Sequence, residues 1–212
     1  MHVFESVNTC TYSSAREHKP GGTERRVLLV GPPGAGKTSQ GTLLASQLGV
    51  PHLSTGTLLR DEVRRGTPVG RRANEYMRAG ALVPDGLVQH VLERRLGDAV
   101  ENGVVLDGYP RTLEQAQRFV RSLGDASLDL VIELAVSDDV VVTRLAGRSS
   151  GNENKLDRRS DDDEHVVRAR LLTHAEQTSP MLDYFAKAGI LVTIDGDRPE
   201  HDIAADLVQL VV

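Results

Sequence analysis

A glycine-rich loop between an apolar run and a helical pattern constrains this chain more than any other part of its sequence. The apolar run Arg26–Val30 is typical of a buried strand, and apolar residues recur at spacings of three and four over Thr38–Leu48. The loop Gly31–Thr38 between them has the pattern G-x-x-x-x-G-K-T. Its glycines let backbone N–H groups turn inward around phosphate oxygens, and the positive end of the following helix points at the same place. The sequence therefore predicts nucleotide binding, without distinguishing a kinase from a GTPase or an ATPase.

Short apolar runs alternate with helical patterns along the rest of the chain. The predicted strands are Arg26–Val30, Val50–Leu53, Gly103–Leu106, Leu128–Ala135 and Ile190–Ile194. The predicted helices are Thr38–Leu48, Asp85–Leu96, Thr112–Leu123, Asp138–Ala146 and Asp162–Phe185. This alternation predicts the α/β class, with a parallel sheet covered by helices on both faces. Pro180 lies inside the last helix and is expected to kink or break it.

Two polar segments do not fit the alternation of strands and helices. Ser54–Val83 has a helical pattern and carries six arginines, whereas Gly147–Arg159 is polar and shows no hydrophobic periodicity. Both are insertions between core elements. Their pattern favours two interpretations equally: mobile segments that cover a ligand, or solvated surface loops.

The composition excludes several classes of protein. The chain has 212 residues and a formal net charge of −5, so it lacks the basic excess of a dedicated nucleic-acid binder. Aromatic residues make up only 3%, so the core is expected to be aliphatic. The single cysteine, Cys10, excludes an intrachain disulfide and a four-cysteine zinc site, and it fits a reducing compartment. No apolar run approaches the roughly 18 residues that a bilayer span needs.

These features predict one cytoplasmic domain with a leading extension and no membrane partner. Residues 1–25 mix charged and small polar residues and lack the apolar core of a signal peptide. We expect them to be poorly ordered. Residues 26–212 are expected to form the folded domain.

Asp107 ends one of the predicted strands. A carboxylate at the carboxyl end of a parallel strand lies on the ligand side of the sheet, where it can hold Mg²⁺ through water. The alternative is an acidic N-cap for the next helix. Gly108 then allows the backbone to approach a ligand closely, and Pro110 stiffens the turn before Arg111.

Several arginines follow the predicted strands or flank the second insertion. They are Arg60, Arg111, Arg144, Arg148, Arg159 and Arg170. Taken singly, each is a candidate surface residue, but as a set around one cleft they would compensate the charges of two polyphosphates. After the second predicted strand no carboxylate occurs before Asp61, so a base for an alcohol acceptor is missing there. This favours an acceptor that is already ionised, such as a nucleoside monophosphate (NMP).

Motifs spread over the chain resemble, in content and in order, those of the adenylate kinase family. They are Gly31–Ser39, Leu53–Arg60, Gly80–Asp85, Leu106–Gln115, Arg158–Arg170 and Asp195-Gly196, and the resemblance covers Arg26 to about Val212. It implies a P-loop NTPase core with strand order 2-3-1-4-5, an NMP-binding insertion at residues 54–83 and a short lid at residues 147–159. It also implies a monomer that transfers a phosphoryl group reversibly from ATP to AMP, with Mg²⁺, to give two ADP.

The resemblance assigns residues to both nucleotides. The implied ATP positions are Gly34, Ala35, Gly36, Lys37, Thr38, Ser39, Arg144, Arg148 and Arg198. The implied AMP positions are Thr55, Arg60, Ala81, Leu82, Val83, Gly108, Tyr109, Pro110, Arg111, Gln115, Arg159 and Arg170. The implied catalytic positions are Lys37, Asp107, Arg111, Arg148, Arg159, Asp161 and Arg170. Gln115 would read the adenine edge, and Arg60 and Arg111 would hold the AMP phosphate.

Three departures from the family pattern bear on these assignments. The lid has about a dozen residues, like the short-lid variants, and with Cys10 alone it cannot hold zinc. Thr38-Ser39 stands where the family usually has Gly-Thr, so Thr38 is a candidate direct ligand of Mg²⁺. Thr57 replaces a usual acidic residue, which concerns the anchoring of its helix more than the choice of substrate.

Two alternative functions stay open at this point. One is a UMP/CMP kinase of the same family, against which Thr55 and Gln115 argue by resemblance. The other is a nucleotide-binding module without catalysis, which would not need the full set of arginines together with Lys37 and Asp107.

Overall fold

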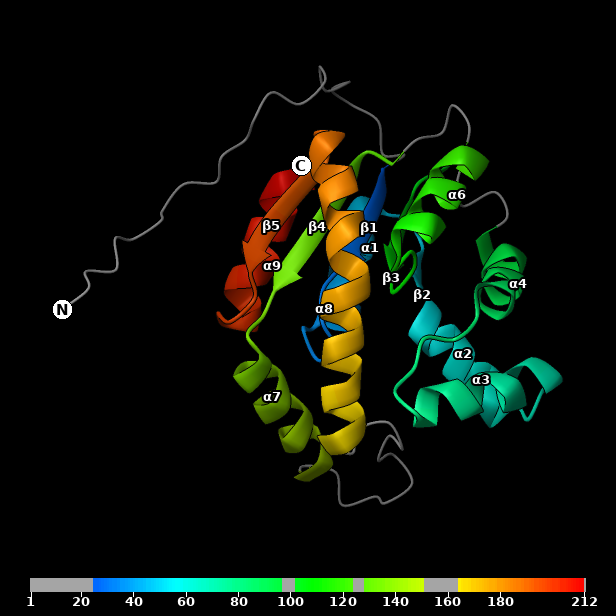
Figure 1. Cartoon of the computed structure of the whole chain (residues 1–212). Coiled ribbons are helices and arrows are strands. Elements are labelled where there is room, and N and C mark those ends of the chain that lie inside the picture. The colour runs from blue at the N-terminus through cyan, green and yellow to red at the C-terminus, as the bar shows by residue number, and fades with distance from the viewer. Residues whose placement is uncertain (1–24, 97–101, 124–127, 151–163, 212) are drawn as a thin grey trace.

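The computed structural model describes residues 25–96, 102–123, 128–150 and 164–211 as a sheet covered by helices (Figure 1). The strands are β1 (Arg26–Val30), β2 (His52–Ser54), β3 (Val104–Asp107), β4 (Leu130–Ala135) and β5 (Leu191–Asp195). The helices are α1 (Lys37–Leu48), α2 (Thr55–Arg64), α3 (Pro68–Arg78), α4 (Asp85–Leu96), α6 (Leu113–Leu123), α7 (Asp138–Ser150), α8 (Glu164–Lys187) and α9 (Glu200–Val211). Each predicted strand is confirmed, with ends shifted by no more than a few residues.

The five strands run parallel in the order β2-β3-β1-β4-β5. The expected fold class and strand order are therefore confirmed. β1 lies in the centre, where Leu29 is in register with Asp107 of β3 on one side and with Ile132 of β4 on the other. Because parallel strands end at the same edge, this register brings the loop after β1 beside Asp107 and the segment that follows it.

Each face of the sheet carries its own hydrophobic cluster. Along β1, Val27 and Leu29 belong to one cluster and Leu28 and Val30 to the other, since successive side chains point to opposite faces. The first cluster includes buried side chains of α1 and α9, and the second includes those of α4, α6 and α8. Figure 1 accordingly shows α8 crossing the near face of the sheet, with α1 behind it. Both clusters are mainly aliphatic, as the composition predicts.

The first polar insertion folds as a helical hairpin, α2 and α3, beyond the end of β2 (Figure 1). Thr67 caps α3 by accepting a hydrogen bond from the Gly70 N–H at 3.0 Å, and Pro68 occupies the first turn, where a missing N–H costs little. Gly70 packs directly on the backbone of α2: a Cβ there would lie 2.1 Å from the Glu62 carbonyl oxygen. Close packing of the two helices therefore depends on Gly70.

The expectation that Pro180 would break the long helix is wrong. α8 continues from Glu164 to Lys187 with Pro180 inside it. Proline removes the hydrogen bond to the carbonyl four residues earlier, which belongs to Glu176, and both residues are exposed, so that carbonyl can turn to water. Met181 and Phe185 are buried in the core just after Pro180, and their packing favours continuation of the helix.

The second polar insertion is only partly described. Its first residues, 147–150, extend α7 beyond the predicted end at Ala146, while residues 151–159 lie outside the described part of the chain, as does nearly all of the predicted 1–25 extension. Within the described ranges, no helix combines the length and the apolar character that a membrane crossing requires.

Gly70→Ala is expected to lower the free energy of unfolding by about 1–3 kcal/mol, because the added methyl group overlaps the backbone of α2. Gly86→Ala is the matched control, since a Cβ at Gly86 meets no atom within 4 Å; it should be neutral or stabilising by up to about 1 kcal/mol. Urea denaturation of both variants measures the difference. Equal stability of the two would contradict the packing assigned to Gly70.

Candidate active site

The glycine-rich loop between β1 and α1 leaves backbone N–H groups uncovered at the start of α1. Gly34 and Gly36 adopt left-handed conformations, with φ of 81° and 88°, which a residue with a side chain rarely takes. Gly36 occupies the N-cap of α1, so no side chain of that residue covers the first N–H groups of the helix. Lys37 donates hydrogen bonds from Nζ to the carbonyl oxygens of Gly31 and Pro32, both at 2.7 Å. The ammonium group therefore lies inside the loop where phosphate oxygens would bind.

Asp107 lies beside this loop and is only 4% exposed. Its Oδ2 accepts a hydrogen bond from Thr38 Oγ1 at 2.9 Å, which joins the carboxyl end of β3 to the first turn of α1. The alternative role as a helix cap is wrong, because Thr112 caps α6 instead: the Gln115 N–H donates to Thr112 Oγ1 at 3.2 Å. Asp107 is therefore a buried carboxylate at the ligand edge of the sheet, next to a hydroxyl group.

Arg111 is held by the turn that carries it. Its Nε donates to the Gly108 carbonyl at 2.6 Å, and its own backbone N–H donates to Gln115 Oε1 at 2.7 Å. The pKa of Arg111 is lowered, chiefly by burial and then by the charge of Arg170, while Asp107 acts in the opposite direction. The guanidinium is thus a partly buried cation with a second cation close by, an arrangement that an anion would stabilise.

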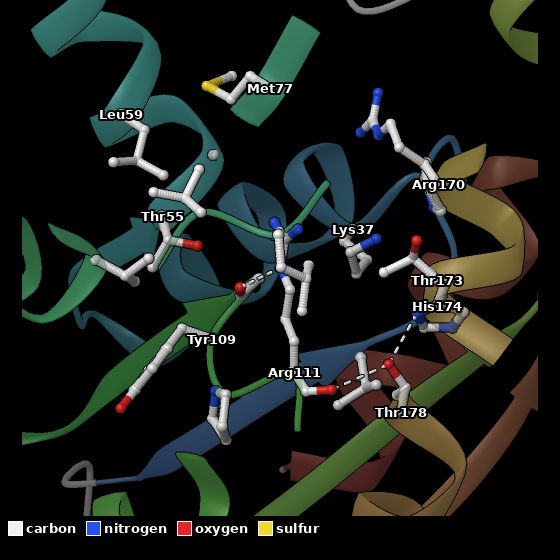
Figure 2. Close-up of a pocket in the computed structure, with 18 of the residues that line it drawn as sticks. Lys37, Thr55, Leu59, Met77, Tyr109, Arg111, Arg170, Thr173, His174 and Thr178 are labelled. Carbon is white, nitrogen blue, oxygen red and sulfur yellow. Dashed lines mark hydrogen bonds between the residues drawn. The ribbon is translucent and has the colours of Figure 1, made fainter. Parts of the chain in front are cut away.

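A cavity of about 110 Å³ opens between the P-loop, the α2–α3 hairpin and α8 (Figure 2). It is lined by most of the residues that the resemblance assigns to AMP, together with Lys37: Thr55, Arg60, Ala81, Leu82, Val83, Gly108, Tyr109, Pro110, Arg111, Gln115 and Arg170. These residues come from six separate stretches of the chain. The fold therefore brings together the sequence-predicted AMP residues that it describes.

Three of these positions show why the site needs its particular residues. Thr55 is buried and its Oγ1 donates to the Asp107 carbonyl at 3.3 Å. Gly108 has φ of 84°, and a Cβ there would lie 2.7 Å from Thr55 Oγ1. Gln115 is buried with its amide already held, since Oε1 accepts from Arg111 and Nε2 donates to Asp85 Oδ1. Its orientation toward the cavity is therefore set by the protein.

Arg144 and Arg198 meet at a different place from this cavity. Arg144 Nη2 donates to the carbonyl oxygens of Gly196 at 2.8 Å and Arg198 at 3.4 Å, which ties α7 to the loop after β5. Neither arginine is among the residues that line the cavity. Arg148 belongs to α7, but its side chain, like Arg159 and Asp161, lies outside the described residues.

The sequence reasoning missed several residues that line the cavity. Apolar Leu59 and Met77 come from the hairpin, and Thr173, His174 and Thr178 come from α8. The spacing of His174 and Thr178 in the sequence could have indicated them. Each lies four residues after the previous member of the series that begins at Arg170, so all three share one face of the helix. The pKa of His174 is lowered to about 4, first by burial and then by the charges of Lys37 and Arg111.

The lowered pKa of His174 predicts a pH-dependent stability. The unfolded chain binds a proton at this imidazole below its ordinary pKa of 6.5, whereas the folded protein does so only below about 4. The neutral imidazole therefore contributes on the order of 3 kcal/mol to the free energy of unfolding above pH 6.5. This contribution is lost as the pH falls toward 4. In His174→Gln the free energy of unfolding should fall less steeply over this window.

Urea denaturation at several pH values between 4 and 7 measures this slope. His90→Gln, a change at an exposed histidine of α4, is the control and should keep the wild-type slope. If His174→Gln and wild type lose stability in parallel as the pH falls, His174 is not a buried neutral imidazole.

Comparisons with known proteins agree with this geometry. The family model described as "Adenylate kinase" matches residues 29–190. The chain is 45% identical over 174 residues to "Adenylate kinase" of Nocardia farcinica, an alignment that covers 81% of this chain and 90% of that one. It is 42% identical over 205 residues to "Adenylate kinase" of Acidothermus cellulolyticus, covering 85% and 94%, respectively. It is 39% identical over 186 residues to "Adenylate kinase 1" of Nostoc sp., covering 86% and 96%. The chain therefore belongs to the adenylate kinase family, the phosphotransferases that interconvert ATP and AMP with two molecules of ADP.

Proposed function

We propose that, in the reaction ATP + AMP = 2 ADP, this chain binds AMP in the cavity beside α8 and binds the ATP phosphates in the P-loop. The observation that supports this division most directly is the position of Lys37, Arg111 and Arg170, which come from three separate elements and line one cavity. Three cations at one cavity suit a pair of phosphate chains that meet there. Phosphoryl transfer depends mainly on positioning and on compensation of charge, and this lining can supply both.

On the donor side, the P-loop and the start of α1 would hold the ATP phosphates. The backbone N–H groups of residues 34–39 suit oxygen atoms of the β- and γ-phosphates. Lys37 would exchange the Gly31 and Pro32 carbonyls for a phosphate oxygen, since both contacts are short-range hydrogen bonds to neutral groups. Arg144, held by the carbonyls after β5, would lie over the adenine of ATP near Arg198.

On the acceptor side, Arg60 and Arg111 would hold the AMP phosphate. Both side chains line the cavity, and Arg60 is oriented there by a hydrogen bond from Nη2 to Thr57 Oγ1 at 3.2 Å. Thr57 thus supports Arg60 directly although it replaces an acidic residue of the family pattern. Apolar side chains such as Leu59 and Met77, with the backbone of residues 81–83, would contact the adenosine.

In the transfer itself, an oxygen of the AMP phosphate attacks the γ-phosphorus of ATP in line, and the bond to the β-phosphate oxygen breaks. The AMP phosphate is already ionised, so no side chain has to remove a proton. Arg170, with Arg148 and Arg159 from the lid, would compensate charge on the transferring group, oriented by Asp161. Closure of residues 54–83 and 147–159 would exclude water, which would otherwise accept the phosphoryl group.

The residues at the end of β3 fit Mg²⁺. Mg²⁺ prefers oxygen ligands and keeps several of its waters, so it needs few protein ligands. Asp107 is a buried carboxylate beside the P-loop, and Thr38 Oγ1 lies 2.9 Å from its Oδ2. Asp107 would hold the ion through water and Thr38 would be a direct ligand. The ion would offset phosphate charge when bound.

We also propose the domain limits, the oligomeric state and the cellular location of this enzyme. Residues 26–212 would form the working enzyme, with the NMP-binding insertion at 54–83 and the lid at 147–159, and residues 1–25 would be a poorly ordered extension. The enzyme would act as a cytoplasmic monomer, without a nucleic-acid or membrane partner. The mildly acidic overall charge supports the absence of a nucleic-acid partner, and the single cysteine supports a reducing compartment; the monomer rests on the family resemblance.

Arg111→Ala is expected to lower kcat by roughly 10²–10³-fold, because it removes a partly buried cation that lines the cavity proposed for the acceptor phosphate. ADP formation is measured in a coupled assay with AMP, UMP, CMP and GMP as acceptors, and wild type should prefer AMP. Arg121→Ala, at an exposed arginine of α6, is the control and should turn over normally. A variant at Arg111 with near-normal kcat, or a wild type that prefers UMP, would overturn the assignment.

Thr38→Ala is expected to raise the Mg²⁺ concentration needed for half-maximal turnover, on the order of tenfold, because a ligand and an orienting contact of Asp107 are lost together. Thr38→Ser keeps the hydroxyl and should behave like wild type. Ser46→Ala, an exposed change on the same helix, is the control. A Thr38→Ala enzyme with an unchanged Mg²⁺ requirement would show that Thr38 is not a ligand.

A further inference from the structure

His174 lies in the cavity at a position that the transfer reaction described above does not use. It is on α8, one turn after Arg170 and one turn before Thr178, and all three side chains line the cavity with Lys37 and Arg111. Figure 2 shows His174 and Thr178 facing the cavity from α8, with Arg111 and Lys37 beside them. An imidazole is therefore part of the wall that would face the phosphates.

Hydrogen bonds determine which ring nitrogen of His174 can titrate. Thr178 Oγ1 donates to the Arg111 carbonyl at 3.2 Å, and the same oxygen lies 3.1 Å from His174 Nδ1. A hydroxyl group has one proton, so with that proton on the Arg111 carbonyl, Nδ1 must carry the hydrogen of the second bond. Nε2 is then the nitrogen that gains or loses a proton.

The charged groups that act on the His174 imidazole are cations: Lys37 from the start of α1 and Arg111 from the turn after β3. Arg170, on α8 itself, lines the same cavity, and the buried carboxylate Asp107 accepts a hydrogen bond from Thr38. Burial and the charges of Lys37 and Arg111 lower the pKa of His174 to about 4, so the imidazole of the free protein is neutral at neutral pH. A further charge among these cations would be unfavourable there.

We propose that His174 takes up a proton when nucleotide phosphates enter the cavity and then serves as a further cationic residue of the phosphate site. The inference rests on the proposed function, because it needs phosphates in this cavity. Phosphates offset the charges of Lys37 and Arg111 and present oxygen acceptors to the wall of the cavity. The proton comes from solvent and forms one new N–H bond at Nε2; no other bond changes.

The uptake of a proton by His174 determines how the affinity for the nucleotide phosphates changes with pH. A group whose pKa is higher in the complex than in the free protein makes binding tighter as the pH falls through the pKa of the complex. Binding to wild type should therefore strengthen on acidification more than binding to a variant that cannot titrate. The ratio of the Kd of His174→Gln to that of wild type should rise by up to about tenfold per pH unit below the pKa of the complex.

Calorimetry of the full-length chain with P1,P5-di(adenosine-5′) pentaphosphate, a bisubstrate probe, tests the proposal. Titrations at pH 6 in three buffers of different ionisation enthalpy give the number of protons taken up on binding. Wild type should take up as much as one proton more than His174→Gln, and the probe's own protonation cancels in this difference. His90→Gln should match wild type, since its side chain is exposed on α4.

A second measurement uses wild type alone and covers the case in which His174→Gln fails to fold. Imidazole NMR signals are followed with and without the probe. One imidazole should titrate near pH 4 in the free protein. With the probe bound, its chemical shifts at pH 6 should be those of a protonated imidazole.

The outcomes separate this inference from the proposed function. The inference is wrong if the probe binds but wild type and both variants take up equal numbers of protons. It is also wrong if the imidazole that titrates near pH 4 stays neutral in the complex. In either case the site assignment stands. If the probe does not bind wild type at all, the proposed function fails first.

Discussion

The main constraint on this molecule is the gathering of positive charge at the carboxyl edge of a parallel sheet. Lys37, Arg111 and Arg170 line one cavity, and burial together with Arg170 already lowers the pKa of Arg111. Packing elsewhere has to outweigh this repulsion. The two hydrophobic clusters fix β1 between β3 and β4 and α8 against the sheet, so the core holds together the elements that carry these cations.

The same edge also holds the groups that moderate this charge. Asp107 is placed opposite Leu29 by the register of β1 and β3, and it lies within hydrogen-bond distance of Thr38 at the start of α1. Hydrogen bonds thus join Thr38 at the start of α1 to Asp107 at the end of β3, and Arg111 to the Gly108 carbonyl in the turn that follows. The α2–α3 hairpin lines the same cavity from one side, through Thr55, Leu59, Arg60 and Met77.

Much of the fold was predictable because its signals are local. The apolar runs and the G-x-x-x-x-G-K-T loop predict the strands and the phosphate site directly, whereas the strand order depended on the family resemblance, since pairing between distant strands leaves no local pattern. The break expected at Pro180 did not occur because buried neighbours hold the helix. His174 was missed for the same kind of reason: only the fold brings α8 beside Lys37 and turns a solitary histidine into part of a cationic wall.

The two hydrogen bonds from Lys37 to the Gly31 and Pro32 carbonyls have a consequence for the energetics of ligand capture. They let the lysine brace the loop in its ligand-ready shape before any nucleotide arrives, so little conformational entropy remains to be lost on binding. The same bonds must be given up when a phosphate enters. A polyphosphate would gain more from the ammonium group than a weakly charged ligand does, and so would displace these bonds more readily. The loop is thus preorganised, with the two carbonyl oxygens standing in for phosphate oxygens around the ammonium group.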